Sequence, residues 1–530
     1  MTDLSPGKTV WSTASTPTIR QSILGERSKF GNESSGLDHF NLDTVQPTWC
    51  SFQGVTCGDV SGSANFGSVI SVDLRSRKLV GSIPSDIINF LSLKRLDLSR
   101  NYLKGAIPSG VNSWAENMVY LDFGVNSLSG SIPEALGTLS SLTYLNLNSN
   151  LFAGKISSSL VSLPAISFLD LHYNLLTGTI PTATSTPSSL TFIDLGSNSL
   201  VGRIPVSLGG KSLQSVHLGF NSLTGLLPPT LLDSSNLKAM RLSYNSLSGE
   251  IPSSVGSLIS LTTLELSGND LTGTIPDSIG LLTAVHWLGL GDNSLSGVVP
   301  DSIGELSSLE YLYLSQNSLS GNIPQSVGNL SRLINLFLDS NKLVGTVPAD
   351  IINLASISWF LLQNNKLTGN IPSDIGKLSS LVYLSLSSNL LTGSIPSSLS
   401  SLKSLSYLYL DENSLAGSIP TSFGLMTSLT NVALYNNNLV GTIPSEMARL
   451  SLLTSLRLRD NYLTMGVLLE VPASTFSTAT LSGELTLSDN CVAFSAVSTA
   501  ATTVTSSRCP NNAISSKKLY CTEFKYIEIK

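Results

Sequence analysis

One asparagine returns at a near-constant interval along most of this chain. Sixteen asparagines keep a spacing of 24 residues, which changes only to 25 after Asn101 and to 23 after Asn198. A fixed period of roughly 20 to 50 residues is the signature of stacked repeat units, so the sequence predicts a solenoid. The sixteen are Asn101, Asn126, Asn150, Asn174, Asn198, Asn221, Asn245, Asn269, Asn293, Asn317, Asn341, Asn365, Asn389, Asn413, Asn437 and Asn461.

Each asparagine lies in a constant frame, which the unit around Asn317 illustrates. Apolar residues such as Leu312 and Leu314 alternate with variable residues before it, which predicts a short strand with one buried face. A buried asparagine amide must find hydrogen-bond partners, and stacked coils offer backbone groups for a ladder. A glycine four residues later recurs in all sixteen complete units from Gly81 to Gly441, and a proline follows in fifteen of them, with Ser157 as the exception. A recurring glycine and proline predict that the part of each repeat after the asparagine forms an irregular convex side, opposite the predicted strand.

The repeating unit resembles a known family. A first unit with Arg77 in the asparagine position raises the count to seventeen. The frame is similar to plant-type leucine-rich repeats marked by Leu-x-Gly-x-Ile-Pro, as in receptor-like proteins, receptor-kinase ectodomains and polygalacturonase-inhibiting proteins. The resemblance covers about residues 45–510. It implies an α/β-type repeat solenoid, a right-handed leucine-rich-repeat superhelix with a parallel concave β-sheet and about 17 repeats of 24 residues.

The repeat boundaries divide the chain into five segments. We expect a poorly ordered segment at 1–44, a cysteine-paired cap at 45–68, the solenoid at 69–480, a second cap at 481–512 and a tail at 513–530. A local irregularity is expected between Asn174 and Asn221, because the stretch from Pro181 to Pro187 replaces the usual convex apolar pair and the next unit is one residue shorter.

The five cysteines lie outside the complete repeats. Cys50 and Cys57 look like the family's paired-cysteine cap, and end coils need such caps to cover exposed core edges. We therefore expect disulfides between Cys50 and Cys57 and between Cys491 and Cys509, with Cys521 free. Disulfides indicate an oxidising compartment, yet no secretory leader is visible after Met1, so a leader missing from the sequence is the favoured explanation. Asn32 and Asn329 fit the glycosylation pattern.

Composition and motifs exclude several classes of function. The net charge of −6 and the pI of about 5.3 give no basic surface for nucleic acid. No apolar run is long enough to span a bilayer. The sequence also carries no Gly-rich phosphate loop, kinase signature or metal-ligand motif, and its four histidines are scattered. We therefore expect no enzymatic activity, no cofactor and no metal site.

The variable strand positions are the candidate binding surface. Two outward columns flank the buried middle residue of each strand. In the early repeats they combine aromatic residues with an acidic stripe, which is Asp73, Asp97, Asp122, Asp170 and Asp194. In the later repeats they form an apolar and aromatic surface, which is His286, Trp287, Tyr311, Tyr313, Phe337, Trp359, Leu361, Tyr383, Tyr407 and Tyr409. Exposed aromatic surfaces often mark interaction sites, but strand-forming aromatics beside buried leucines are an equally weighted explanation.

The resemblance and these columns favour a recognition module. It would bind a peptide, protein or glycan on the concave face, possibly with a co-receptor, at the cell surface or outside the cell. A secreted inhibitor of a cell-wall-degrading enzyme is the second interpretation, and a structural or ice-binding repeat protein is the third. Serine and threonine are abundant but are expected to be scattered over the surface, which disfavours ice binding. A cytoplasmic location is the alternative if the cysteines are reduced.

Overall fold

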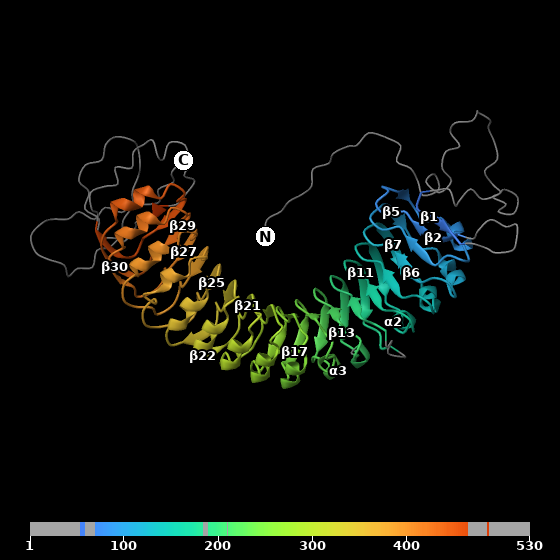
Figure 1. The fold of residues 1–530 in the computed structure, drawn as a ribbon, viewed down its shortest axis with the longest axis horizontal. Coiled ribbons are helices and arrows are strands. Elements are labelled where there is room, and N and C mark those ends of the chain that lie inside the picture. Colours follow the sequence, from blue (N-terminus) through green and yellow to red (C-terminus); the bar gives the residue numbers. More distant parts are fainter. Residues whose placement is uncertain (1–52, 59–68, 184–188, 209, 465–484, 487–530) are drawn as a thin grey trace, which may run out of the picture. The chain divides into compact units, whose positions relative to one another are not determined.

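The computed structural model describes residues 53–58, 69–183, 189–208, 210–464 and 485–486. It divides the chain into two compact units, Met1–Thr224 and Gly225–Lys530, which we call unit 1 and unit 2. Both units are stacks of the same coil, in which a short strand, a turn at the asparagine, a second strand and a short helix follow one another (Figure 1). This confirms the predicted repeat solenoid.

The main strands of unit 1 form a parallel sheet. They are β2 (Val69–Asp73), β4 (Arg95–Asp97), β6 (Tyr120–Asp122), β8 (Tyr144–Asn146), β10 (Phe168–Asp170), β12 (Phe192–Asp194) and β14 (Ser215–His217). Equivalent residues of neighbouring coils pair, as Phe168 does with Phe192. The first strand, β1 (Val55–Cys57), pairs with β2 in the antiparallel direction. A strand of opposite direction ends the repeat pairing, as expected of a cap.

Unit 2 repeats the arrangement with ten parallel main strands among its described residues. They are β16 (Ala239–Arg241), β18 (Thr263–Glu265), β20 (Trp287–Gly289), β21 (Tyr311–Tyr313), β23 (Asn335–Phe337), β25 (Trp359–Leu361), β26 (Tyr383–Ser385), β27 (Tyr407–Tyr409), β29 (Asn431–Ala433) and β31 (Ser455–Arg457). A further strand, β33 (Leu485–Thr486), pairs with β31. The seven and ten main strands of the two units match the seventeen repeats counted in the sequence.

A second row of strands follows the asparagine turns, which the sequence analysis did not predict. In unit 1 it comprises β3 (Val80–Gly81), β5 (Tyr102–Gly105), β7 (Ser127–Ser131), β9 (Leu151–Lys155), β11 (Leu175–Thr179), β13 (Ser199–Arg203) and β15 (Ser222–Gly225). In unit 2 it comprises β17 (Ser246–Glu250), β19 (Asp270–Thr272), β22 (Ser320–Asn322), β24 (Lys342–Val344), β28 (Ala416–Gly417), β30 (Asn438–Thr442) and β32 (Tyr462–Thr464). These strands are staggered, because Ser320 pairs with Lys342, 22 residues on, whereas main strands pair 24 residues apart, as Tyr311 does with Asn335.

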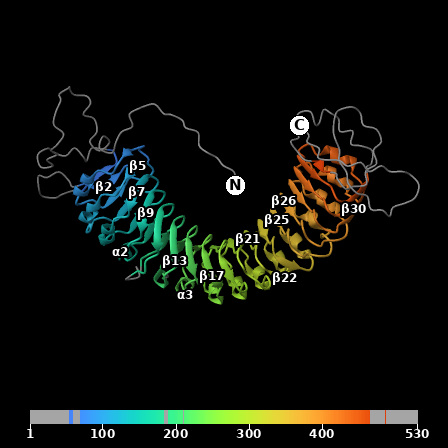
Figure 2. The same ribbon diagram turned by 180° about the vertical axis from the view of Figure 1, so that it is seen from behind.

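Short helices close the coils on the side opposite to the main sheet of each unit (Figures 1 and 2). Most are single turns of 3-10 helix that begin after the repeat proline. In unit 1 they are η2 (Ser85–Asn89), η3 (Ser109–Trp114), η4 (Glu134–Thr138), α2 (Ser158–Val161) and η5 (Val206–Leu208). In unit 2 they are α3 (Pro229–Leu232), η6 (Ser253–Ser257), η7 (Asp277–Leu281), η8 (Asp301–Glu305), η9 (Gln325–Asn329), η10 (Ala349–Asn353), η11 (Ile375–Lys377), η12 (Ser397–Ser401), η13 (Thr421–Leu425) and η14 (Ser445–Arg449). No helix among the described residues is long and apolar enough to cross a membrane.

The predicted asparagine ladder is confirmed. The amide oxygen of Asn341 accepts the backbone N–H of Leu319 in the preceding coil at 3.0 Å. Its amide nitrogen donates to the carbonyls of Leu314, Leu338 and Asp339 at 2.9, 3.1 and 3.1 Å. Every polar atom of this buried side chain is therefore satisfied by backbone groups, which explains why the position demands asparagine.

The repeat position of Gly321 requires glycine for a conformational and a steric reason. Gly321 has a φ of 73°, in the left-handed region. A Cβ at this position would lie 2.7 Å from the Cγ1 atom of Val298 in the preceding coil. Glycine thus allows the second strands of neighbouring coils to approach closely.

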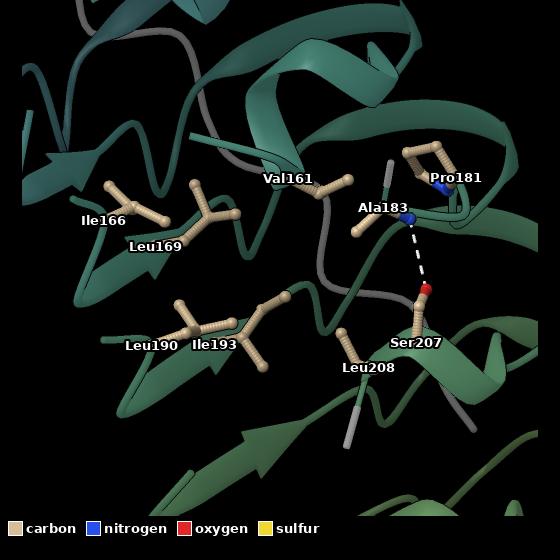
Figure 3. Close-up of a pocket in the computed structure, with 9 residues that line it drawn as sticks. All are labelled: Val161, Ile166, Leu169, Pro181, Ala183, Leu190, Ile193, Ser207 and Leu208. Atoms are coloured by element: carbon tan, nitrogen blue, oxygen red, sulfur yellow. Dashed lines mark hydrogen bonds between the residues drawn. The ribbon is translucent and has the colours of Figure 1, made fainter. Parts of the chain in front are cut away.

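The irregularity expected between Asn174 and Asn221 is present in unit 1. No helix is described in the coil after β11, and the next coil has only the short η5. The backbone N–H of Ala183 donates to the hydroxyl of Ser207 at 3.1 Å, which links the two coils (Figure 3). A cavity of about 10 Å³ lies beside them among apolar side chains that include Leu169 and Ile193. That is roughly the room for one water molecule, so this defect is too small to be a ligand site.

Candidate functional site

The main strands present two columns of side chains on the outward face of each sheet. In β21 the middle residue Leu312 is buried, whereas Tyr311 and Tyr313 on either side of it are partly exposed. Because equivalent residues of adjacent strands pair, each column is continuous along its unit. Equivalent residues therefore form continuous columns, and their contents decide what the face can bind.

In unit 1 the first column is a regular stack of aromatic rings, which we call the ring ladder. Its members are Tyr120, Tyr144, Phe168 and Phe192, with successive ring centroids 4.2, 4.3 and 4.4 Å apart and interplanar angles of 5–7°. The guanidinium of Arg95 lies 3.5 Å from the centroid of Tyr120 at one end. The imidazole of His217 meets Phe192 edge-on at the other end, with centroids 5.3 Å apart. The rings cover one another's faces, so the apolar faces within the ring ladder are already in contact and are not available to a partner.

The acidic stripe beside the ring ladder is mostly buried. Asp97, Asp122 and Asp170 are only 1%, 6% and 5% exposed as whole residues, while Asp73 and Asp194 are half-buried. In Asp97, Asp122, Asp170 and Asp194 the Oδ1 atom accepts the backbone N–H two residues later, at 2.9–3.2 Å. This local capping makes the stripe a structural feature of the turn that follows each strand.

Two further observations reduce the charge that the stripe presents to a partner. Arg95 lies 2.9 Å from Asp97 and 3.9 Å from Asp73, so one cation is shared between two carboxylates. Burial raises the pKa of Asp122 above its ordinary range, which favours its neutral form.

In unit 2 both columns carry aromatic side chains, and together they form a contiguous surface that we call the aromatic patch. It consists of Trp287, Tyr311, Tyr313, Phe337, Trp359, Tyr383, Tyr407 and Tyr409. Trp287 contacts both Tyr311 and Tyr313, with centroids 4.8 and 4.9 Å apart. Trp359 stacks on Tyr383 at 4.8 Å. Interplanar angles range from 6° to 76°, so this surface is uneven.

The aromatic patch is partly exposed to solvent, and its environment keeps the hydroxyl group of Tyr383 neutral. Trp359 is 39% exposed, and the other members are partly exposed, as are the neighbouring His286 and Leu361. Burial, followed by the nearby Tyr409 and Tyr407, raises the pKa of Tyr383 to about 12. At neutral pH this phenol is therefore a hydrogen-bond donor on an apolar surface, a combination that favours Tyr at interfaces.

The remaining predicted residues are only partly within the described chain. Cys57, in β1, is disulfide-bonded, and its partner lies outside the described residues because no other cysteine is among them. Cys50, Cys491, Cys509 and Asn32 also lie outside. Asn329 is exposed at the end of η9, where a glycan has space.

The sequence places Asp170, Asp194 and His217 at the same position of successive strands, but it did not reveal that His172 joins them in one cluster of polar side chains in unit 1. The ligating atoms of Asp170, His172 and Asp194 all lie within 4.8 Å of one another. His217 joins them, with its Nδ1 atom 3.1 Å from Oδ2 of Asp194. The histidines lie 45 residues apart in sequence, but the offsets of 24 residues from Asp170 to Asp194 and 23 from Asp194 to His217 match the repeat spacing, and this signal could have revealed the cluster.

Comparison with known proteins places these features in a family. The leucine-rich-repeat family model matches residues 91–152, 211–271, 259–319, 283–343 and 355–415. No curated protein matches the chain.

Solved structures of plant receptors have similar folds. The ectodomain of the receptor kinase GASSHO1/SCHENGEN3 from Arabidopsis thaliana is 33% identical, with a TM-score of 0.64; the match covers 84% of this chain and 61% of that one. The plant peptide hormone receptor RGFR1, in complex with RGF2, is 29% identical over 84% of this chain and 88% of that one, with a TM-score of 0.65. The Arabidopsis receptor kinase HAESA, in complex with the peptide hormone IDA and the co-receptor SERK1, is 29% identical over 86% and 90%, with a TM-score of 0.63.

Proposed function

The chain is a plant-type leucine-rich-repeat protein, and from this premise we propose that it is a non-enzymatic recognition module whose aromatic patch binds a peptide outside the cell. The observation that carries the proposal is the patch itself. Eight aromatic side chains from six successive strands of unit 2 are in continuous contact on the outward face of the sheet.

The geometry of the patch suits an extended chain. Parallel strands lie about 4.8 Å apart, so a patch that runs from β20 to β27 offers roughly 24 Å of surface perpendicular to the strands. An extended peptide rises about 3.3 Å per residue, so about seven residues match that length. Its apolar side chains would cover the faces of Trp359 and Phe337, and its backbone would meet the hydroxyl groups of Tyr383 and Tyr409.

The solved relatives support a peptide as the ligand class. RGFR1 and HAESA are described in complex with RGF2 and with IDA, and HAESA also with the co-receptor SERK1. These partners belong to those proteins. For this chain they support a ligand of the same class, and an extracellular location in which the disulfide of Cys57 is stable.

The test uses two arrays probed with the full chain, one of synthetic peptides and one of cell-wall oligosaccharides. We expect sequence-selective capture on the peptide array, and its loss in the double variant W359A/Y383A. The matched control is Tyr462→Ala, because Tyr462 is also an exposed aromatic of unit 2 but lies on β32, outside the patch. Capture of oligosaccharides alone, or peptide capture that the double variant retains, would contradict the proposal.

Two other interpretations lead to different outcomes. An inhibitor of a cell-wall-degrading enzyme would slow polygalacturonase activity in solution. Ice binding would produce thermal hysteresis, and it needs a flat, regular array of hydroxyl groups. After the asparagine turns of unit 2 such groups occur, but the hydroxyls of Ser296, Ser320 and Thr368 donate to glycine carbonyls of the preceding coil at 3.1–3.2 Å. The stagger of the second strands also displaces each hydroxyl from the next.

A further inference from the structure

The cluster of Asp170, His172, Asp194 and His217 in unit 1 has the composition of a metal site. Its four side chains come from three successive coils: Asp170 ends β10, His172 follows it in the same coil, Asp194 ends β12 and His217 ends β14. Imidazole nitrogens and carboxylate oxygens are both zinc ligands. We call these residues the Asp–His cluster.

Each proposed ligand atom of the Asp–His cluster lies within 3.8 Å of at least one other. Oδ1 of Asp170 lies 2.6 Å from Nδ1 of His172, and that nitrogen lies 3.8 Å from Oδ2 of Asp194. The same Oδ2 lies 3.1 Å from Nδ1 of His217. Four ligands at about 2.0–2.1 Å from a tetrahedral zinc ion lie about 3.3 Å from one another, which falls within this range.

Hydrogen bonds from neighbouring groups fix the orientation of both carboxylates. Asp170 accepts a hydrogen bond from Nδ2 of Asn148 on its Oδ2 atom at 2.9 Å and one from the backbone N–H of His172 on its Oδ1 atom at 3.1 Å. Oδ1 of Asp194 accepts the backbone N–H of Gly196, also at 2.9 Å. Outer hydrogen bonds of this kind orient metal ligands, and here Oδ1 of Asp170 and Oδ2 of Asp194 face the two imidazoles.

The ring of His217 directs one nitrogen to the cluster. Its Nδ1 atom faces Asp194, whereas its Nε2 atom is buried and its ring packs against Phe192. A divalent cation bound between these side chains would compensate the charges of Asp170 and Asp194, and charges taken out of water need such a partner.

We propose that the Asp–His cluster binds one divalent transition-metal ion of the zinc class, through Oδ1 of Asp170, Nδ1 of His172, Oδ2 of Asp194 and Nδ1 of His217. Two nitrogen and two oxygen ligands suit zinc and its neighbours in the first transition row, whereas Ca²⁺ and Mg²⁺ prefer oxygen ligands throughout. The bound ion ties together three coils of unit 1. Metal binding therefore stabilises unit 1 and does not depend on the peptide proposed for unit 2.

The test is isothermal titration of the full chain, stripped with a chelator, with ZnCl₂. We expect one zinc ion per chain. The variant D194N keeps the shape of the residue that faces both imidazoles, and it should weaken zinc binding about 100-fold or more, because second-shell changes alone cost about 10- to 100-fold. N148A should weaken it about tenfold for the same reason. Zinc should also raise the thermal unfolding midpoint of the parent but not that of D194N.

The matched control is H286N, because His286 is partly exposed on the sheet face of unit 2, away from the cluster. Its zinc affinity should equal that of the parent. If D194N does not fold, H172N replaces it, since the side chain of His172 is 27% exposed at the rim of the cluster. The proposal is overturned if the parent takes up no stoichiometric zinc, if D194N or H172N binds zinc as tightly as the parent, or if H286N loses the ion equally.

Discussion

The ring ladder of unit 1 and the aromatic patch of unit 2 occupy equivalent strand positions, yet they differ in form. In the ladder, Tyr144 and Phe168 lie face to face, 4.3 Å apart and within 7° of parallel. In the patch, Tyr313 and Phe337 meet at 76°. Aromatic residues at the same place in a repeat can therefore either stack on one another or keep ring faces available to a partner.

The adjacent column decides between these outcomes. In unit 1 the neighbour of each ring is an aspartate or asparagine, and the aspartates fold back onto the turn, as Asp122 does onto Gly124. The rings then form a single file and stack. In unit 2 a second aromatic column competes for the same contacts, so that Trp287 touches two tyrosines and several rings tilt, although Trp359 and Tyr383 stack within 6° of parallel. Tilted rings leave apolar faces uncovered, which is a feature of binding surfaces.

The largest effect is expected from the aromatic patch. Each of the changes Trp359→Ala and Tyr383→Ala should cost about 2 kcal/mol of binding free energy, or roughly 30-fold in affinity, if the residues are anchors. Stability should change little because both side chains point away from the core. Surface plasmon resonance with a captured peptide, together with thermal unfolding, separates the two quantities. A large loss of stability without a loss of affinity would show that the aromatic patch, like the ring ladder, stabilises the fold and does not bind the peptide.

The ring ladder should show the opposite behaviour. Phe168→Ala removes two stacked contacts, each worth about 0.5–1.5 kcal/mol, together with half-buried apolar area. We expect unit 1 to lose about 2 kcal/mol of stability, while peptide binding stays unchanged. Hydrogen exchange of β8, β10 and β12 is the appropriate measurement, because repeat arrays need not unfold in one step. Loss of peptide affinity in this variant would show that the ladder is also a binding surface.

A smaller effect is expected from the acidic stripe. Asp97→Asn keeps the acceptor for the N–H of Ser99 but removes the charge that faces Arg95 at 2.9 Å. Because Arg95 is about one-third exposed, we expect a loss of only about 1 kcal/mol at neutral pH. Chemical denaturation at low and high salt measures it. An unchanged stability, accompanied by slower association of a basic partner, would instead show that the stripe steers such a partner to the sheet.

The smallest effect concerns Asp122, and its sign depends on pH. Burial raises the native pKa of Asp122, so the native state holds its proton more tightly than the unfolded chain does. The resulting stability is fully present below the ordinary carboxyl pKa of about 4 and is lost as pH rises through the raised native value. Asp122→Asn should therefore match the parent in unfolding midpoint at low pH and exceed it slightly at neutral pH. A variant that is less stable than the parent at neutral pH would contradict this.

Much of the fold could be predicted because the repeat encodes its own contacts. The asparagine period determined the number of coils, the position of each main strand and the ladder that Asn341 illustrates. The outward columns followed from the alternation of buried and exposed residues, so the contiguity of Trp359 and Tyr383 was also predicted. The second row of strands was not, because the repeat glycine and the proline that follows it indicate irregular structure until the stagger between coils is known.

What only the tertiary structure decided is how side chains on neighbouring coils meet. The sequence by itself placed Asp97 and Asp170 in an outward column, but whether a carboxylate turns to solvent or back to its own turn depends on local hydrogen bonds that periodicity does not encode. It also left His172 and His217 far apart. Stacking brings them to the same carboxylate of Asp194, because each coil advances the chain by only one strand spacing while it adds about 24 residues of sequence.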